Sequence, residues 1–339
     1  MLADRRSNWP NLVPVGRRGP VLRPSSAAPG VFGVDLTAGC AHACVYCPVS
    51  MHSRSDAAEE RLPFDPYTTE ALAAALDAAS AEVRTIVLSP QTDPLPLLGP
   101  VRAEAARVAE LVLSRGLDLV VMTRGRFSRR MIRLLAAHPR QVRVGVGLFS
   151  LSRPLVRELE PLAASPFGRV RDIRRLVTAG VPVDVRLEPL IPGLTDTREN
   201  LAPLFRALAQ AGASRVVAHY LFMHPKVQTS LAGALTNLKY PVGPGEMFAE
   251  GPKATVGTIG MVRNLPREVR REGLARVMSW GAEFGLEVTT GAAQNPDLPR
   301  NPGPAPQLLP ASSGSRRRAS SVYTGYPTPP SAPTATALS

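Results

Sequence analysis

The sequence of 339 residues predicts an α/β fold, a partial barrel built from six strand–helix units. The first observation is that short apolar runs with strand character alternate along the chain with segments of helical periodicity. The second is that Gly116, Gly180 and Gly212 stand where three of these helices should end, as glycine commonly does. Such connections between strands of one sheet are right-handed and leave the strands parallel. Six of these units predict a partial (β/α)6 barrel.

The elements of the predicted barrel follow one another in alternation. Strands are expected at residues 34–37, 85–89, 117–122, 142–149, 181–187 and 215–221. Helices are expected at residues 68–79, 101–114, 129–137, 170–179 and 198–211. A further helix is expected to begin near Pro266 and to pack on the barrel, because proline is favoured in the first turn of a helix.

Composition divides the chain into four parts. Residues 31–225 are expected to form the barrel, and residues 226–295 a C-terminal extension with a loop or lid and a packing helix. Residues 1–30 are an expected extended basic arm, and the Pro- and Ser-rich residues 296–339 an expected disordered tail. The sequence has neither a signal peptide nor an apolar run long enough for a membrane span, so a cytoplasmic protein is expected.

All three cysteines, Cys40, Cys44 and Cys47, stand within one short stretch that follows the first predicted strand. A secreted protein spreads an even number of cysteines along the chain to close loops. An odd set in one loop indicates thiolate ligands of a metal or cluster, and three ligands leave one coordination position open. The alternative is a structural zinc site that takes His42 or His52 as its fourth ligand.

Polar side chains follow the other predicted strands at the ends where those strands stop. They are Gln91, Thr92 and Asp93, then Thr123, Arg124 and Arg126, then Ser150, then Arg186 and Glu188, and finally His219, Tyr220 and His224. In parallel barrels the functional site lies at the carboxyl ends of the strands. We therefore expect these groups to surround the cysteine loop.

The Cys-x3-Cys-x2-Cys spacing, with Tyr46 before the last cysteine, resembles the signature of the radical SAM superfamily. This resemblance implies that three thiolates hold three irons of a [4Fe-4S] cluster and that the fourth iron binds S-adenosylmethionine. An electron from the cluster then cleaves the S–C5′ bond and yields a 5′-deoxyadenosyl radical. A one-electron reductase of the flavodoxin or ferredoxin type is the implied partner. The barrel is then of the radical SAM type.

The span from about 33 to 225 is similar to the spore photoproduct lyase-like branch, also called DNA repair photolyase-like. The pieces that carry this similarity are the cysteine stretch 36–47, Thr-Asp-Pro at 92–94, the Thr-basic pair at 123–124, Leu-Glu-Pro at 159–161 before Ser165 and Pro166, and the Arg186 strand running into 189–193. The cysteine motif is specific for the superfamily, and the other pieces are less specific.

The resemblance also assigns roles to five residues around the predicted cofactor. Tyr46 would contact the adenine of S-adenosylmethionine, and Asp93 would receive its amino group. Thr123, Arg124 and Arg186 would lie near the ribose or the methionyl carboxylate, because a guanidinium binds a carboxylate bidentately. The alternatives are structural: Asp93 before a proline can form an Asx turn, and Arg186 can pair with neighbouring groups on its own strand.

Two departures leave the substrate open. Spore photoproduct lyases use an additional cysteine as hydrogen-atom donor, and this chain has no fourth cysteine; Tyr220 is one alternative donor. Pro48 stands where those lyases have a second tyrosine. The candidate functions are a radical SAM enzyme acting on a nucleic acid, one acting on a small molecule or peptide, and a non-catalytic iron–sulfur or zinc protein.

The net charge of +13 makes a nucleic acid one candidate partner. Part of that charge lies in the two terminal segments. Nearly all of the basic residues are arginine, as in proteins from GC-rich genomes. Arg124, Arg126, Arg129 and Arg130 form a local basic cluster that could meet a polyanion at the mouth of the site. The alternative for Arg129 and Arg130 is the solvated face of a helix.

Overall fold

A computed structural model describes residues 11–16, 19–25, 28–49, 61–79, 82–256, 259–291, 295 and 297–298. Its strands are β1 (Asn11–Pro14), β2 (Arg23–Pro24), β3 (Val31–Val34), β4 (Arg61–Phe64), β5 (Thr85–Leu88), β6 (Asp118–Thr123), β7 (Val142–Gly147), β8 (Val183–Leu190), β9 (Arg215–Tyr220), β10 (Lys253–Val256), β11 (Gly260–Arg263) and β12 (Glu287–Thr289). The predicted arm before residue 11 and the predicted tail after residue 298 lie outside the described residues.

The helices are α2 (Thr68–Ala78), α3 (Gly99–Ser114), α4 (Arg129–Ala137), α5 (Arg153–Leu159), α6 (Pro166–Thr178), α7 (Arg198–Gln210), the short 3-10 helix η2 (Pro225–Val227), α8 (Gln228–Asn237), α9 (Pro244–Met247) and α10 (Arg267–Ala282). Among the described helices, none is both long enough and apolar enough to cross a lipid bilayer.

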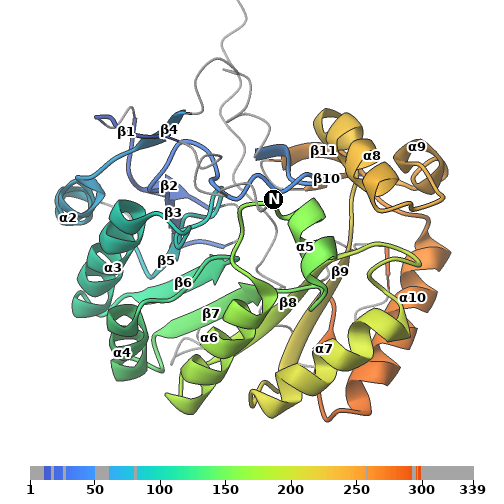
Figure 1. Cartoon of the computed structure of the whole chain (residues 1–339). Coiled ribbons are helices and arrows are strands. Elements are labelled where there is room, and N and C mark those ends of the chain that lie inside the picture. The colour runs from blue at the N-terminus through green and yellow to red at the C-terminus, as the bar shows by residue number, and fades with distance from the viewer. Residues whose placement is uncertain are drawn as a thin grey trace, which may run out of the picture.

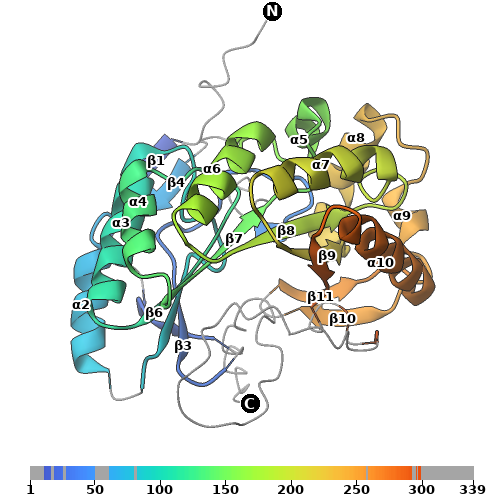
Figure 2. The ribbon, with the colours of Figure 1, turned by 90° about the horizontal axis from the view of Figure 1, so that it is seen from below.

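The central element is an eight-stranded sheet with the order β12-β9-β8-β7-β6-β5-β3-β2. The run from β3 to β9 is parallel throughout, and β12 joins it parallel to β9, whereas β2 pairs antiparallel with β3. The helices α3, α4, α6 and α7 lie along the outer side of the curved sheet (Figures 1 and 2). This arrangement confirms the predicted α/β fold of the radical SAM partial-barrel type.

The core lies between the sheet and these helices, and local sequence explains why the elements form. All four residues of β5 are buried, as expected for an apolar strand covered on both faces. Ser128 caps α4 by accepting a hydrogen bond from the Met131 amide. Gly116, Gly180 and Gly212 adopt φ of +74°, +77° and +81° after their helices, which confirms the predicted glycine ends.

Two boundaries differ from the predicted ones for physical reasons. Strand β3 ends at Val34, because the following residues turn to β4 instead: Thr37 bridges Phe64, and the Asp65 amide donates to the Leu36 carbonyl. Helix α6 begins earlier than predicted, at Pro166, because the Ser165 side chain caps it.

The segment after β9 covers the open end of the half-barrel. Helix α8 contacts the cysteine loop, since the Ser230 hydroxyl donates to the Val45 carbonyl at 2.7 Å. Strands β10 and β11 form an antiparallel hairpin, and the Met223–Arg263 bridge connects it to the chain after β9. Ile259 of this hairpin reaches the wall of the cavity that holds the cysteines. A cover over the site was predicted for this part of the chain.

Helix α10 and β12 are part of the same body as the barrel. Arg270 of α10 is almost fully buried, donates to the Leu265 carbonyl, and pairs with Asn295 and Asp297. Strand β12 then lies beside β9 at the edge of the sheet. The sequence had predicted the helix that begins near Pro266 but not the strand that follows it.

Candidate functional site

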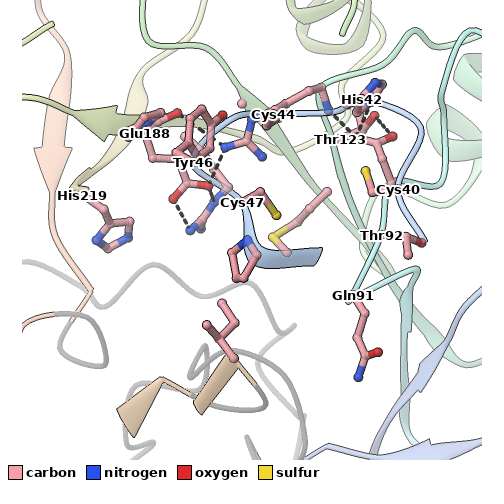
Figure 3. Close-up of a pocket in the computed structure, with 18 of the residues that line it drawn as sticks. Cys40, His42, Cys44, Tyr46, Cys47, Gln91, Thr92, Thr123, Glu188 and His219 are labelled. Carbon is pink, nitrogen blue, oxygen red and sulfur yellow. Dashed lines mark hydrogen bonds and ion pairs between the residues drawn. The ribbon is translucent and has the colours of Figure 1, made fainter. Parts of the chain in front are cut away.

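The cysteine loop lies at the carboxyl ends of the parallel strands, where it forms one wall of a cavity (Figure 3). All three cysteines line this cavity. The five other predicted site residues line it as well: Tyr46, Asp93, Thr123, Arg124 and Arg186. Strands β5, β6, β8 and β9 thus bring together groups that are far apart in the sequence, as the strand-end argument predicted.

The three thiols are held in a tight, partly enclosed turn. Cys44 is buried and Cys40 and Cys47 are half-buried, and the Cys47 amide donates to the Cys44 carbonyl at 3.1 Å. Burial raises the pKa of the Cys40 thiol, and Asp93 and Cys47 raise it further. Burial also raises the pKa of Cys44. Loss of the proton from these sulfurs therefore requires a nearby positive charge, which a coordinated metal supplies.

Residues 159–162 support the cysteine loop from behind. The Val45 amide donates to the Leu159 carbonyl at 3.1 Å, and the Leu162 amide donates to the His42 carbonyl at 3.2 Å. These contacts resemble the pairing of two short strands, so the loop is fastened along its length. The Leu-Glu-Pro piece that the sequence analysis singled out is this supporting segment.

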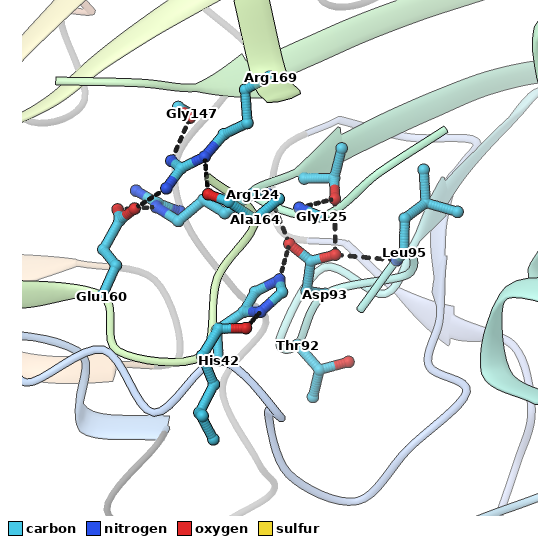
Figure 4. Close-up of polar contacts among 12 residues, drawn as sticks. His42, Thr92, Asp93, Leu95, Arg124, Gly125, Gly147, Glu160, Ala164 and Arg169 are labelled. Carbon is cyan, nitrogen blue, oxygen red and sulfur yellow. Dashed lines mark hydrogen bonds and ion pairs between the residues drawn. The ribbon is translucent and has the colours of Figure 1, made fainter. Parts of the chain in front are cut away.

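Glu160 is the polar centre of that support, and the sequence analysis did not predict it as a site residue. Its buried carboxylate accepts from the Tyr46 hydroxyl at 2.5 Å, from Arg124 Nε at 2.7 Å and from Arg169 Nη2 at 2.5 Å (Figure 4 shows the two arginines). Burial alone would raise the pKa of Glu160, but Arg169 and Arg124 hold it below its ordinary value. Glu160 therefore fixes both Tyr46 and Arg124 beside the cysteines.

The two predicted carboxylate-binding arginines are both engaged by the protein. Arg186 donates from Nε and Nη2 to the two oxygens of Glu188, at 2.9 and 2.8 Å. Arg124 Nη2 lies 3.5 Å from Glu188 Oε1. Burial opposes ionisation of Glu188, yet Arg186 and Arg124 lower its pKa to about 2. A ligand carboxylate would thus compete with Glu188 for these guanidinium groups.

Strand β7 makes room for the arginines because it carries glycine where its side chains would face them. A Cβ at Gly147 would lie 2.9 Å from Cγ of Arg124, and one at Gly145 would lie 3.2 Å from Cδ of Arg186. Glycine inside a strand commonly marks such a close approach. The alternating glycines of β7 were the signal in the sequence that could have located the neighbours of this strand.

Asp93 lies at the meeting point of three segments (Figure 4). One oxygen accepts from the Leu95 amide at 2.8 Å and from the Thr123 hydroxyl at 2.6 Å. The other accepts from the Arg124 amide at 2.6 Å and lies 3.0 Å from His42 Nε2. The Asx turn that the sequence left open is therefore present. The Thr123 hydroxyl is likewise engaged by the protein, since it also accepts from the Gly125 amide.

A scan against family models matches the Radical SAM superfamily over residues 34–204. That span covers half of the chain. The chain belongs to the radical SAM superfamily. The cofactors of this superfamily are a [4Fe-4S] cluster and S-adenosylmethionine, and its enzymes generally need an external electron donor.

The chain is similar in sequence to curated proteins whose names describe no activity. The chain is 29% identical over 213 residues to the uncharacterized protein Rv2578c of Mycobacterium tuberculosis, which covers 59% of this chain and 61% of that protein. It is 25% identical over 206 residues to the uncharacterized protein ORF301 of Acidianus two-tailed virus, covering 56% and 67% of the two chains. The chain thus spans about three fifths of the length of the mycobacterial relative.

Solved structures of spore photoproduct lyase share the fold. The lyase complexed with dinucleoside spore photoproduct gives a TM-score of 0.59 at 13% identity, over 82% of this chain and 81% of the other. A mutant lyase with bound AdoMet gives 0.57 at 12% identity, over 76% and 75%. At this identity the match shows the architecture alone.

The donor set of this radical SAM chain fits an iron–sulfur cluster better than a single zinc ion. Three thiols on one loop, each able to bind a different iron, are the donor set that a [4Fe-4S] cluster with one open iron requires. His42, one proposed fourth zinc ligand, has its Nδ1 3.3 Å from the Leu162 carbonyl oxygen and its Nε2 3.0 Å from Asp93 Oδ2. His52 lies outside the described residues.

Two further polar residues that the sequence predicted at a strand end, His219 and Tyr220 of β9, differ in their surroundings. His219 is buried in the cavity wall, and within the described part of the chain its Nδ1 has no hydrogen-bond partner; burial and the nearby Arg186 lower its pKa to about 4. The Tyr220 hydroxyl donates to Asp196 at 2.5 Å and faces Gly273 of α10. Tyr220 also lines the cavity, and Asp196 fixes the position of its hydroxyl.

The predicted basic cluster is largely paired outside the cavity. Arg126 forms an ion pair with Asp172 of α6, and Arg130 forms one with Glu110 of α3. Of the four arginines in this cluster, Arg124 alone lines the cavity. The interpretation as a helix face with local ion pairs therefore accounts for Arg130 of α4, whereas Arg126 precedes that helix and pairs with α6.

Proposed function

We propose that this protein reductively cleaves S-adenosylmethionine and uses the resulting 5′-deoxyadenosyl radical to abstract a hydrogen atom from a substrate. The observation that carries the proposal is the placement of Cys40, Cys44 and Cys47 on one loop in the wall of a cavity at the carboxyl ends of the parallel strands. These thiolates would hold three irons of the cluster and leave the fourth iron for the cofactor.

The chain's own residues supply binding and orientation. Tyr46, fixed by Glu160, presents its ring beside the last cysteine, in keeping with its proposed contact to adenine. Arg124 and Arg186 line the cavity, where the methionyl carboxylate would bind by competing with Glu188 for their guanidinium groups. Thr123 supports the same wall from the end of β6.

The substrate would enter at the end of the cavity away from Cys40. Glu188 and His219 lie at that end (Figure 3), and the apolar side chains of Phe222 and Ile259 also line the cavity. Both cavity arginines are already paired with carboxylates. This charge balance favours an uncharged part of a substrate at this end.

A nucleic-acid substrate is the finer proposal that the similarity to the lyase branch suggests, and a small molecule or peptide is the alternative. Lyase chemistry by the known route needs a further cysteine, and all three cysteines of this chain are in the cluster loop. A flavodoxin or ferredoxin would serve as the one-electron donor.

The test is anaerobic reconstitution with iron and sulfide, followed by addition of S-adenosylmethionine and dithionite. We expect about four irons per chain and formation of 5′-deoxyadenosine. Alanine in place of Cys40, Cys44 or Cys47 should abolish that product, whereas the His138→Phe control far from the cavity should not. Wild-type protein that holds one zinc and no sulfide would refute the proposal.

A further inference from the structure

His42, in the middle of the cysteine loop, fastens that loop from two sides. The residue is 2% exposed. On one side its carbonyl accepts from the Leu162 amide, and its Nδ1 lies 3.3 Å from the Leu162 carbonyl oxygen. On the other side its Nε2 lies 3.0 Å from Asp93 Oδ2. A single side chain thus connects the loop to the supporting segment and to the β5–β6 region.

The loop needs such a fastening because its backbone is strained at the next residue. Ala43 has φ of +52°, in the left-handed region that residues with a Cβ avoid. A strained conformation persists only where the surrounding structure holds it. Ala43 stands between His42 and Cys44, so its conformation decides how the second cysteine is presented relative to the first.

Asp93 connects His42 to the carboxyl end of β6. Its carboxylate holds the Thr123 hydroxyl and the Arg124 amide on β6, and the Leu95 amide in its own loop. The side chain of Asp93 is 7% exposed. Its Oδ1 accepts two hydrogen bonds, whereas its Oδ2 accepts one and lies 3.0 Å from His42 Nε2. An ammonium group of a ligand would have to share the carboxylate with these groups.

We propose that His42 and Asp93 are positioning residues that set the geometry of the cysteine loop, and that Asp93 acts through His42 rather than by contact with the cofactor. The inference goes beyond the proposed reaction and concerns how the three sulfurs are held. Groups that orient metal ligands typically change metal affinity or activity about 10–100-fold when they are removed.

The test compares His42→Phe, Asp93→Asn and the double variant with wild type and with the His138→Phe control, which makes the same change at a half-buried histidine of α4. Three quantities are measured: iron and sulfide retained after reconstitution, the dissociation constant of S-adenosylmethionine, and the electron paramagnetic resonance spectrum of the reduced cluster. Circular dichroism confirms that each variant is folded.

We expect each single variant to retain about 10-fold less iron than wild type, or still less, and to give a broadened electron paramagnetic resonance spectrum. The double variant should retain no less iron than the poorer of the two single variants. Adding Ala43→Gly to His42→Phe should restore part of the retained iron, because glycine adopts φ of +52° without strain.

Two results would overturn the proposal. One is an Asp93→Asn protein that keeps its iron but binds S-adenosylmethionine much more weakly, while His42→Phe binds it normally, since that pattern marks a direct ligand. The other is full additivity of the two single losses. Wild-type protein that retains no cluster would refute the proposed function instead. The coupling of His42 and Asp93 would then be tested by comparing the losses of thermal stability of the two single variants with that of the double variant, in the metal-free protein.

Discussion

Replacing the buried Glu160 with glutamine should destabilise the protein far more than the same change at an exposed glutamate. Glu160 and Arg169 both have fully buried side chains and pair at 2.5 Å. Glutamine keeps one acceptor oxygen, so an amide N–H would face one of the guanidinium groups that the carboxylate now satisfies. The change therefore leaves a buried cation without its counter-ion.

The size of the stability loss depends on whether Arg124 or Arg169 loses its counter-ion. Removing one partner of a buried ion pair costs about 3–5 kcal/mol. Arg124 is 24% exposed and stays near Glu188, so its share of the loss is screened. Arg169 keeps its bonds to the Ala164 and Gly147 carbonyls, which places the expected loss near the lower end, about 3 kcal/mol. That is a large part of the ~5–15 kcal/mol of a typical domain.

The assay is urea unfolding of the metal-free protein at neutral pH, in which Glu160→Gln should lower the midpoint without changing the slope. The matched control is Glu110→Gln, which removes an exposed partner of Arg130 and should cost no more than ~1 kcal/mol. Equal, small effects in the two variants would refute the assignment of Glu160 as a buried structural charge.

The same variant makes a prediction about pH. The pKa of Glu160 is lower in the folded protein than its ordinary value of 4.5. Its stabilisation is therefore complete above that ordinary value and is lost as the pH falls through the folded pKa. Wild type should approach Glu160→Gln in stability on acidification, whereas a gap that widens toward low pH would contradict this sign.

Four further outcomes are expected. Ala43→Gly alone should stabilise the metal-free protein by up to ~1 kcal/mol in urea unfolding, because it removes a left-handed residue that carries a Cβ; a loss of stability would contradict the strain. Gly147→Ala should weaken S-adenosylmethionine binding in calorimetry while circular dichroism stays native, because the new Cβ displaces Arg124. Tyr220→Phe should leave 5′-deoxyadenosine formation unchanged but lower the melting temperature, since it removes the hydrogen bond to Asp196. Spore photoproduct in DNA should remain unconverted in the presence of cofactor and reductant, and efficient release of two thymines would disprove the argument from the missing cysteine.

The parallel strands and most helices could be predicted because their signals are local. Helix α5 was missed, since Pro154 was not recognised as a first-turn proline although Ser152 caps the helix in front of it. Strand β12 was missed because three residues carry little periodicity and the strand is defined by its neighbour β9. Local chemistry thus predicted elements, and only contacts between distant segments defined their edges.

The site shows the same division. The spacing of the cysteines predicted their role directly, because a short loop brings them together whatever the rest of the chain does. Glu160 could not be recognised, because Arg124 and Arg169 reach it from β6 and α6. For Asp93, a turn residue and a cofactor ligand have the same local sequence. The distances to His42, Thr123 and Arg124 are needed to separate these two roles.

The glycines of β7 have a consequence for how variation in this chain should be interpreted. Gly145 and Gly147 sit in a buried strand, and a survey that classes positions by burial would treat changes there as changes of packing alone. An added carbon at Gly147 would instead press on Arg124, and one at Gly145 on Met122 and the stem of Arg186, all of which line the cavity. Graded substitutions along β7 therefore offer a way to adjust ligand preference from within the scaffold, without replacing any side chain that meets the ligand.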